Sequence, residues 1–348
     1  MAVKRLKRYI ATGLLGVATI FAACKGGKNA PDVSNIKVDL STRRLDRDLL
    51  QLDTNHLAAG LRSLDAKYPD FLNFYLDTLM GFGINRNYTD TNGGISDGLK
   101  TFLTYKDYRG LFDTVNKHFP DTKMVDEDLR NGFKYMKHYY PEFKIPKVVY
   151  FISGLNNWSA ITYGDVVGVG LDMYLGPKYP YYASVGIPAY VTQHLLPQYV
   201  SVNVMSALYY NGHPFVMEGK NLLDLMIQRG KQQYFLEKVL PFADDTLRFG
   251  YTGKQMEWCN KSEADIYNFF LAQNLMYETN WQKIVRYVND GPNATGMPAE
   301  SPGNIGSWLG YKIVSAYMAQ HPDLTMEKML AQKDDAQKIL QESKYKPK

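Results

Sequence analysis

His194 is the residue best placed for metal chemistry, and it closes the segment 190–194, which reads YVTQH. Zinc hydrolases with the H-E-x-x-H motif carry two histidines on one helix face, with a glutamate between them that activates a metal-bound water. Tyr190 and Val191 stand here where the first histidine and the glutamate would be. Catalytic zinc needs three protein ligands, whereas His194 and the downstream carboxylate of Glu218 supply two. The sequence therefore predicts no metal, no cofactor and no catalytic residue.

Three other catalytic patterns are incomplete. Ser153 follows an apolar run, but no G-x-S-x-G motif surrounds it. Glu257 and Glu263 are six residues apart and would diverge on one helix, which disfavours glycoside chemistry. A glycine-rich stretch falls inside a predicted hairpin rather than before a helix, so it does not predict a phosphate loop; its glycines are Gly164, Gly168 and Gly170.

Binding is the chemistry left for the polar and aromatic residues in the second half of the chain. His194 and Tyr251 are typical of pocket walls, where an apolar ring and a polar atom are both useful. Lys231 and Glu263 are interpreted either as pocket residues or as a structural ion pair, and the tryptophans either as pocket or as core. The candidate pocket residues are His194, Glu218, Lys231, Tyr251, Trp258, Glu263 and Trp308.

The elements that must position these residues are mostly helical. Apolar residues recur every three or four positions, as at Leu57, Leu61 and Leu64, which predicts amphipathic helices. Gly306 and Gly310, four residues apart, would let another element approach a late helix closely. The predicted helices cover 55–66, 68–80, 97–117, 125–140, 222–240, 252–258, 263–275, 312–320 and 334–342.

The middle of the chain changes to a strand pattern. Residues 148–152 are β-branched or aromatic, and 160–163 and 166–171 resemble a hairpin around Gly164-Asp165. A small sheet of about three strands between helices is also the layout of thermolysin-like zinc metallopeptidases. We therefore expect an α+β, mainly α-helical fold with a zincin-like architecture and a degenerate active site.

The start of the chain carries a targeting signal. Four basic residues within 4–8 precede a short apolar run that ends in Ala22, Ala23 and Cys24, which is typical of a signal peptide. The run is shorter than the roughly 20 residues needed to cross a bilayer. A cysteine directly after two alanines predicts a lipoprotein with Cys24 acylated, for example by palmitate, although a plain secretory signal is the alternative.

Net charge and length limit the possible partners and the domain organisation of the chain. The intact chain of 348 residues has a formal charge of +5, and removing the four basic signal residues leaves about +1. This small charge does not predict nucleic-acid binding, which favours a concentrated basic face. We expect a signal peptide at 1–23, a flexible tether at 24–35, one mainly helical domain at 36–332 and a basic tail at 333–348.

Several segments together resemble the GldB family of gliding-motility lipoproteins from Bacteroidota. They follow the family's order over most of the mature chain. The segments are Phe133–Pro141, Gly170–Gly176, Met226–Phe235, Leu240-Pro241, Gly250–Thr252, Glu257-Trp258 and Ser301–Gly310.

The resemblance implies a lipid-anchored envelope protein associated with gliding motility or the cell-surface machinery. It also implies a fold related to putative zinc peptidases whose catalytic motif has decayed. We expect a non-catalytic binding or assembly component with envelope protein partners and a membrane contact through its lipid. Residues 25–28 lack the acidic character of a surface-export signal, which favours a periplasm-facing protein. The alternative is a divergent zinc hydrolase with unusual ligands.

Overall fold

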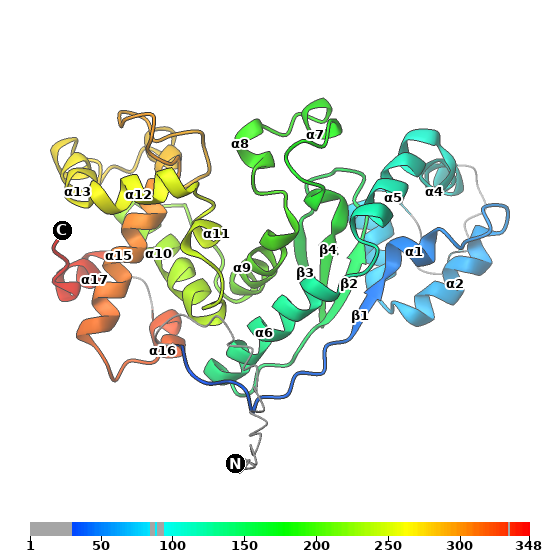
Figure 1. The fold of residues 1–348 in the computed structure, drawn as a ribbon, viewed down its shortest axis with the longest axis horizontal. Helices are drawn as coiled ribbons and strands as arrows, with labels where there is room; N and C mark the ends of the chain where they lie inside the picture. The colour runs from blue at the N-terminus through cyan, green and yellow to red at the C-terminus, as the bar shows by residue number, and fades with distance from the viewer. Residues whose placement is uncertain (1–29, 84–87, 89–93, 333–334) are drawn as a thin grey trace, which may run out of the picture.

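The computed structural model describes residues 30–83, 88, 94–332 and 335–348 (Figure 1). Helices predominate, and one small mixed sheet lies among them. This arrangement confirms the predicted α+β class with mainly helical content. The signal peptide, Cys24 and the tether as far as residue 29 lie outside the described residues.

The sheet forms around the apolar middle of the chain. Strands β2 (Lys147–Phe151), β3 (Ala160–Tyr163) and β4 (Val166–Gly170) lie where the sequence predicted them. β2 and β4 are parallel, and β3 is antiparallel to β4. All of β4 and all but the first residue of β2 are buried, as expected of a parallel pair covered on both faces.

An edge strand that the sequence analysis missed completes the sheet. β1 (Thr42–Arg44) pairs in parallel with β2, with Thr42 opposite Val148. The strand order is β1-β2-β4-β3, so the sheet has four strands rather than about three. Three residues reading Thr-Arg-Arg have no apolar alternation and give no strand signal; contacts with distant residues stabilise the strand instead.

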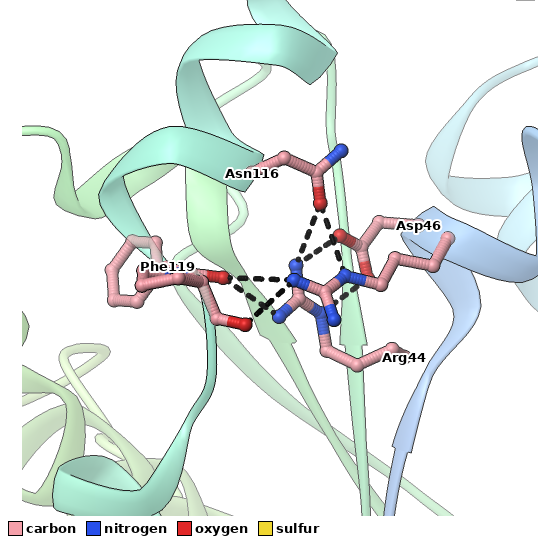
Figure 2. A network of polar contacts seen from close by, with 6 residues as sticks. Arg44, Asp46, Asn116 and Phe119 are labelled. Carbon is pink, nitrogen blue, oxygen red and sulfur yellow. Dashed lines mark hydrogen bonds and ion pairs between the residues drawn. The ribbon is translucent and has the colours of Figure 1, made fainter.

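Those contacts form a clamp made by Arg44 and Arg47, which we call the arginine clamp. Arg44 binds the fully buried Asp46 through two N–O contacts of 2.8 and 2.7 Å. Arg44 and Arg47 also donate to the carbonyl of Phe119 at 3.0 and 3.2 Å, and Asn116 accepts from both (Figure 2). Phe119 caps the C-terminus of α5, so two cations meet the negative end of that helix.

The first half of the chain forms helices α1 to α6 around this side of the sheet. The predicted helix at 97–117 is two helices, because Tyr105 adopts an extended conformation between them. The predicted helix at 68–80 starts only after Asp70, whose φ is +60°, and its second half is a π-helix, Tyr75–Leu79. The α-helices are α1 Leu45–Leu49, α2 Leu57–Lys67, α3 Phe71–Phe74, α4 Gly94–Thr104, α5 Lys106–His118 and α6 Lys123–Tyr139.

The second half contains helices α7 to α17, among them the 18-residue α10. Asn221 and Thr252 each form a capping box, at the starts of α10 and α12, and α15 begins at Ile305, before the predicted helix start at 312. Two 3₁₀ turns, Pro197–Tyr199 and Val285–Tyr287, precede α9 and follow α14. The α-helices are α7 Tyr181–Ser184, α8 Ala189–Thr192, α9 Val200–Gly212, α10 Leu222–Val239, α11 Asp245–Phe249, α12 Gly253–Lys261, α13 Glu263–Ala272, α14 Trp281–Ile284, α15 Ile305–Gln320, α16 Met326–Ala331 and α17 Ala336–Ser343.

Helices α10 and α15 pack closely through glycines. A Cβ on Gly310 would lie 1.8 Å from the carbonyl oxygen of Met226, and one on Gly230 would lie 2.3 Å from the backbone of Gly310. A Cβ on Gly306 would meet Met226 and the carbonyl of Tyr287. The close approach predicted from Gly306 and Gly310 is therefore confirmed, and Gly230 is the contact point on α10.

The packing order runs from the sheet to the C-terminus. α9 lies against β3, α10 packs on α9, α15 packs on α10, and α17 packs on α15 (Figure 1). α10 is consequently buried on most sides, and its few accessible polar atoms lie beside cavities. Among the described residues no helix is long and apolar enough to cross a membrane.

Candidate functional site: a polar pocket on α10

A pocket of about 430 Å³ lies on one face of α10. Arg229, Gln232, Gln233 and Leu236 line it, and their spacing places them on one side of the helix. Opposite them lie α9, the end of α11, residues 288–290 and the start of α15. Segments distant in the sequence thus meet around one cavity.

A chain of hydrogen bonds fixes one wall of the pocket. Arg229 donates through Nη1 to the hydroxyl of Tyr210, and this hydroxyl donates to Oε1 of Gln232. Gln232 in turn donates from Nε2 to Oγ of Ser206 at 3.2 Å. Burial raises the pKa of Tyr210 despite the nearby guanidinium, so the hydroxyl stays protonated and can donate.

The guanidinium of Arg229 is held in place while part of it stays available. It lies 4.2 Å from the ring centre of Phe215, a cation–π distance, and Nη2 donates to Asn289 at 3.3 Å. Its Nε is buried and has no hydrogen-bond partner among the described residues. In that part of the chain no carboxylate pairs with Arg229. Its charge is thus oriented but not neutralised.

Gln233 is the most unusual polar side chain of the pocket. Only 6% of its surface is exposed, and its Oε1 is buried without a hydrogen-bond partner in the described structure. A buried acceptor left unpaired costs about 1–3 kcal/mol. The amide oxygen of Gln233 therefore needs a donor that the described residues do not supply, from water or from a ligand.

Arg248 supplies a second cation at the end of α11. Its side chain is buried, donates from Nη1 to the carbonyl of Gln233 at 3.3 Å, and pairs with Asp245. It also lies 5.6 Å from the ring centre of Tyr311. Because Asp245 offsets its charge, Arg248 contributes less positive potential to the pocket than Arg229.

His194 closes the pocket toward a second, smaller hollow of about 120 Å³. Its Nε2 lies 2.7 Å from the carbonyl oxygen of Gly250, and since a carbonyl only accepts, this ring nitrogen carries the proton. Gly250 has φ +68°, and a Cβ there would lie 3.0 Å from the imidazole. Tyr251, Pro292 and Pro302 are among the residues of the smaller hollow.

Polar groups at the start of α15 complete the rim. Asn304 is the N-cap residue of this 16-residue helix, but its side chain does not cap the backbone. It donates from Nδ2 to Asp290 at 3.0 Å. Asn304 and the buried Ser307 both line the pocket, so the positive end of the α15 dipole points toward it.

The comparisons with known proteins identify the family. The model of a family described as gliding motility protein GldB matches residues 26–347. The chain belongs to the GldB family. No curated protein and no solved structure matches it significantly. The predicted relationship to zinc metallopeptidases and the zincin-like architecture therefore remain predictions, whereas the GldB resemblance is confirmed and associates the chain with gliding motility.

Segments that carried the GldB resemblance form much of the pocket. Residues 226–235 include Arg229, Gln232 and Gln233, and residues 301–310 include Asn304 and Ser307. The segment 250–252 begins at the glycine that accepts the His194 bond. The site is therefore built largely from the segments through which this chain resembles the GldB family.

Two of the residues predicted from sequence meet at the pocket. His194 and Tyr251 both line the smaller hollow, and the hydroxyl of Tyr251 donates to the carbonyl of Asn304 at 3.2 Å. Burial raises the pKa of Tyr251 well above its usual value, so its hydroxyl stays neutral. These two residues position the rim between the two hollows.

The other predicted residues lie elsewhere. Lys231 is buried on α10 and donates to the carbonyl of Met329 at 3.1 Å, at the end of α16. Glu218 is exposed in the loop before α10. Glu263, Trp258 and Trp308 lie on α13, α12 and α15 and are not among the lining residues of either hollow. Glu263 pairs with Lys312 at 2.9 Å, and Lys312 lies 5.3 Å from the ring centre of Trp308. Trp258 is half-buried against the core.

Ser153, Glu257 and Glu263, the residues considered for catalysis from the sequence, form structural hydrogen bonds or ion pairs in this GldB-family chain. Ser153 is buried and donates from Oγ to Asp172 at 2.9 Å. Glu257 on α12 is exposed and pairs with Lys261 of the same helix, whereas Glu263 on α13 is buried and pairs with Lys312. Among the described residues there is no group of three His, Cys, Asp or Glu side chains able to hold a metal ion.

Sequence reasoning missed Arg229, Gln232, Gln233 and Arg248. Polar residues at spacings of three and four within the apolar pattern of 222–240 were the available signal. On an amphipathic surface helix such residues would face solvent. Only the burial of α10 on most sides shows that they face a cavity.

Proposed function

We propose that this GldB-family protein is a non-catalytic binding component of the gliding or cell-surface machinery that holds a partner segment in the pocket on α10. The observation that carries the proposal is the unpaired Oε1 of Gln233, a buried acceptor beside a cavity. A bound partner that supplies a donor would satisfy this group.

The contacts of the candidate chemical groups support binding over catalysis. His194 uses Nε2 to hold Gly250 and so closes a wall of the pocket. Arg229, Tyr210 and Gln232 form a fixed network without a nucleophile beside a base. Such fixed donors and acceptors are suited to recognition, since preorganisation lowers the entropic cost of binding.

We further propose that the chain acts in the cell envelope, periplasm-facing and anchored through acylated Cys24. A single acyl chain binds membranes only marginally, so stable anchoring needs the several chains of a lipoprotein.

Crosslinking in native envelopes tests the binding role. A tagged chain is crosslinked and purified as wild type, as Gln233→Glu and as Arg62→Gln, which removes an exposed positive charge on α2. We expect a crosslinked partner with wild type and Arg62→Gln and a loss of roughly tenfold or more with Gln233→Glu. Equal capture by all three proteins would contradict a binding role for the pocket.

The hydrolase alternative is tested on the same purified protein. We expect no stoichiometric zinc and no peptidase activity. Zinc bound at one ion per chain, lost on His194→Ala together with a hydrolytic activity, would replace the binding role with an enzymatic one.

A further inference from the structure

Two arginine side chains and one carboxylate, that of Asp290, line the pocket on α10. Arg229 has no carboxylate partner in the described part of the chain, and Arg248 faces the cavity although Asp245 pairs with it. Asp290, exposed at the rim, is engaged by the side chain of Asn304. The N-terminus of α15 adds its partial positive charge. A negatively charged ligand group would supply the carboxylate partner that Arg229 lacks among the described residues.

The two unpaired atoms on α10 need hydrogen-bond partners of opposite kinds. Arg229 Nε is a buried donor that lacks an acceptor, and Gln233 Oε1 is a buried acceptor that lacks a donor. The two residues are four positions apart on one helix and line the same cavity, so both atoms can be served by one small group. A carboxylate alone supplies acceptors only, and an amine alone supplies donors only.

The C-terminal residue of a peptide carries a hydrogen-bond acceptor and a donor close together. Its carboxylate accepts, and its amide N–H, one carbon away, donates. A pocket of about 430 Å³ falls within the roughly 300–1,000 Å³ of small-ligand sites and admits a chain end rather than a folded domain. The smaller hollow past His194 adjoins the pocket through shared lining residues, which offers the preceding residue a place.

We propose that the pocket on α10 binds the C-terminal residue of a peptide or protein partner, with Arg229 recognising its carboxylate and Gln233 its last amide N–H. This assignment rests on the proposed binding function and specifies its ligand. Capture of a terminal carboxylate by preorganised donors is an established mode of peptide recognition.

Calorimetric titration of the full-length protein with defined peptides tests the assignment. The probes are pools of N-acetylated tripeptides, one pool for each C-terminal residue, each prepared as free acid and as carboxamide. We expect at least one acid pool to bind and its carboxamide to bind roughly tenfold to a hundredfold more weakly, because a charge-assisted hydrogen bond is lost. Equal binding of acid and carboxamide, or no binding of any acid pool at millimolar concentration, would overturn the proposal.

Variants separate recognition from folding. Gln233→Leu removes the unpaired acceptor, so we expect an unchanged or higher melting temperature together with weaker binding of the acid pool. Gln233→Glu places a carboxylate opposite the ligand, and Arg229→Met removes the cation, so both should weaken binding at least tenfold while Arg62→Gln leaves it unchanged. Undiminished binding by Gln233→Leu and Gln233→Glu would contradict the role of Gln233 even if Arg229→Met failed to fold.

Two further arms identify the source of the carboxylate. Acetate and glucuronate carry the charge without an adjacent amide, and binding of either as tightly as the best tripeptide acid would overturn the peptide assignment. Partner capture that depends on Gln233 while no tripeptide acid binds would likewise overturn the carboxylate proposal and leave the binding function standing. Capture that is independent of Gln233 would contradict both.

Discussion

The buried polar side chains of this protein fall into two groups. The fold supplies hydrogen-bond partners for some of them and not for others. Asp172 is satisfied: it accepts hydrogen bonds from the backbone N–H groups of Ser153 and Leu155 and from the hydroxyl of Ser153, at 2.8–2.9 Å. Gln233 is not, because its buried Oε1 lacks a partner among the described residues. Sequence alone does not separate them, since a buried polar residue is defined by its neighbours.

The carboxyl of Asp172 should make stability depend on pH. Burial raises its pKa above the usual 3.8 despite the three hydrogen bonds that lower it. The folded state then binds more protons than the unfolded state between these two values, so stability falls as pH rises through this window. We expect the urea-unfolding advantage of wild type over Asp172→Asn, about 1–3 kcal/mol at low pH, to shrink as pH rises. An advantage that grows with pH would contradict the raised pKa.

The thiol of Cys259 should be inert in the folded protein. It is completely buried, and burial raises its pKa to about 12, so almost no reactive thiolate forms at neutral pH. In a Cys24→Ala variant Cys259 is the one remaining thiol, and we expect Ellman's reagent to modify it only after denaturant is added. Rapid modification at pH 7 without denaturant would show that α12 opens readily.

At the scale of elements, close contacts determine what the pocket can be. The glycines between α10 and α15 bring the two helices together and so place Asn304 and Ser307 opposite Arg229. The arginine clamp holds the edge strand of the sheet in place, because its hydrogen bonds join β1 to the end of α5 (Figure 2). Both contacts join segments that are far apart in sequence.

Gly310→Ala should separate α10 from α15. A Cβ there would lie 1.8 Å from a backbone oxygen of Met226, which cannot move as a side-chain end can. We expect a loss of about 3 kcal/mol or more in thermal or urea unfolding. Gly110→Ala is the matched control, because its Cβ meets nothing within 4 Å on the exposed face of α5, and should stabilise by up to about 1 kcal/mol. Equal effects of the two substitutions would contradict the contact.

Asp46→Ala should break the arginine clamp. It removes a fully buried carboxylate from its bidentate pair with Arg44 and leaves the guanidinium partly buried, at a cost of about 3 kcal/mol. Glu127→Ala removes a carboxylate from the exposed pair with Arg130 and should cost less than about 1 kcal/mol. Chemical denaturation measures both, and a loss for Asp46→Ala no larger than that for Glu127→Ala would exclude the clamp as a major stabilising contact.

At the scale of the whole molecule, the proposed membrane anchor would decide where the protein works. The acylated cysteine is proposed from the sequence, and Cys24 lies outside the described residues. We expect Cys24→Ala to move the protein from the membrane fraction to the soluble periplasmic fraction while its melting temperature stays the same, because the domain begins after the tether. Unchanged membrane association of the variant would contradict lipidation.

The sequence by itself determined the class of the fold and the family. The periods of the apolar residues predicted most helices and the β3–β4 hairpin, and the ordered segments indicated the GldB family, because these signals are local or are matched residue by residue. Strand β1 and the division of 97–117 escaped it, because contacts over long sequence separations stabilise β1 and a backbone conformation at Tyr105 divides the helix.

Only the tertiary structure decided which polar residues share a site. His194 and Tyr251 were found from sequence and do meet, while Lys231 and Glu263 bind the ends and sides of other helices. From the sequence, Arg229 and Gln233 belong to an ordinary polar helix face. In the structure α9, α11 and α15 surround that face and form a cavity with it. The physical reason is that periodicity tells which residues share a helix face, whereas the packing of distant helices determines whether that face meets solvent, core or a cavity.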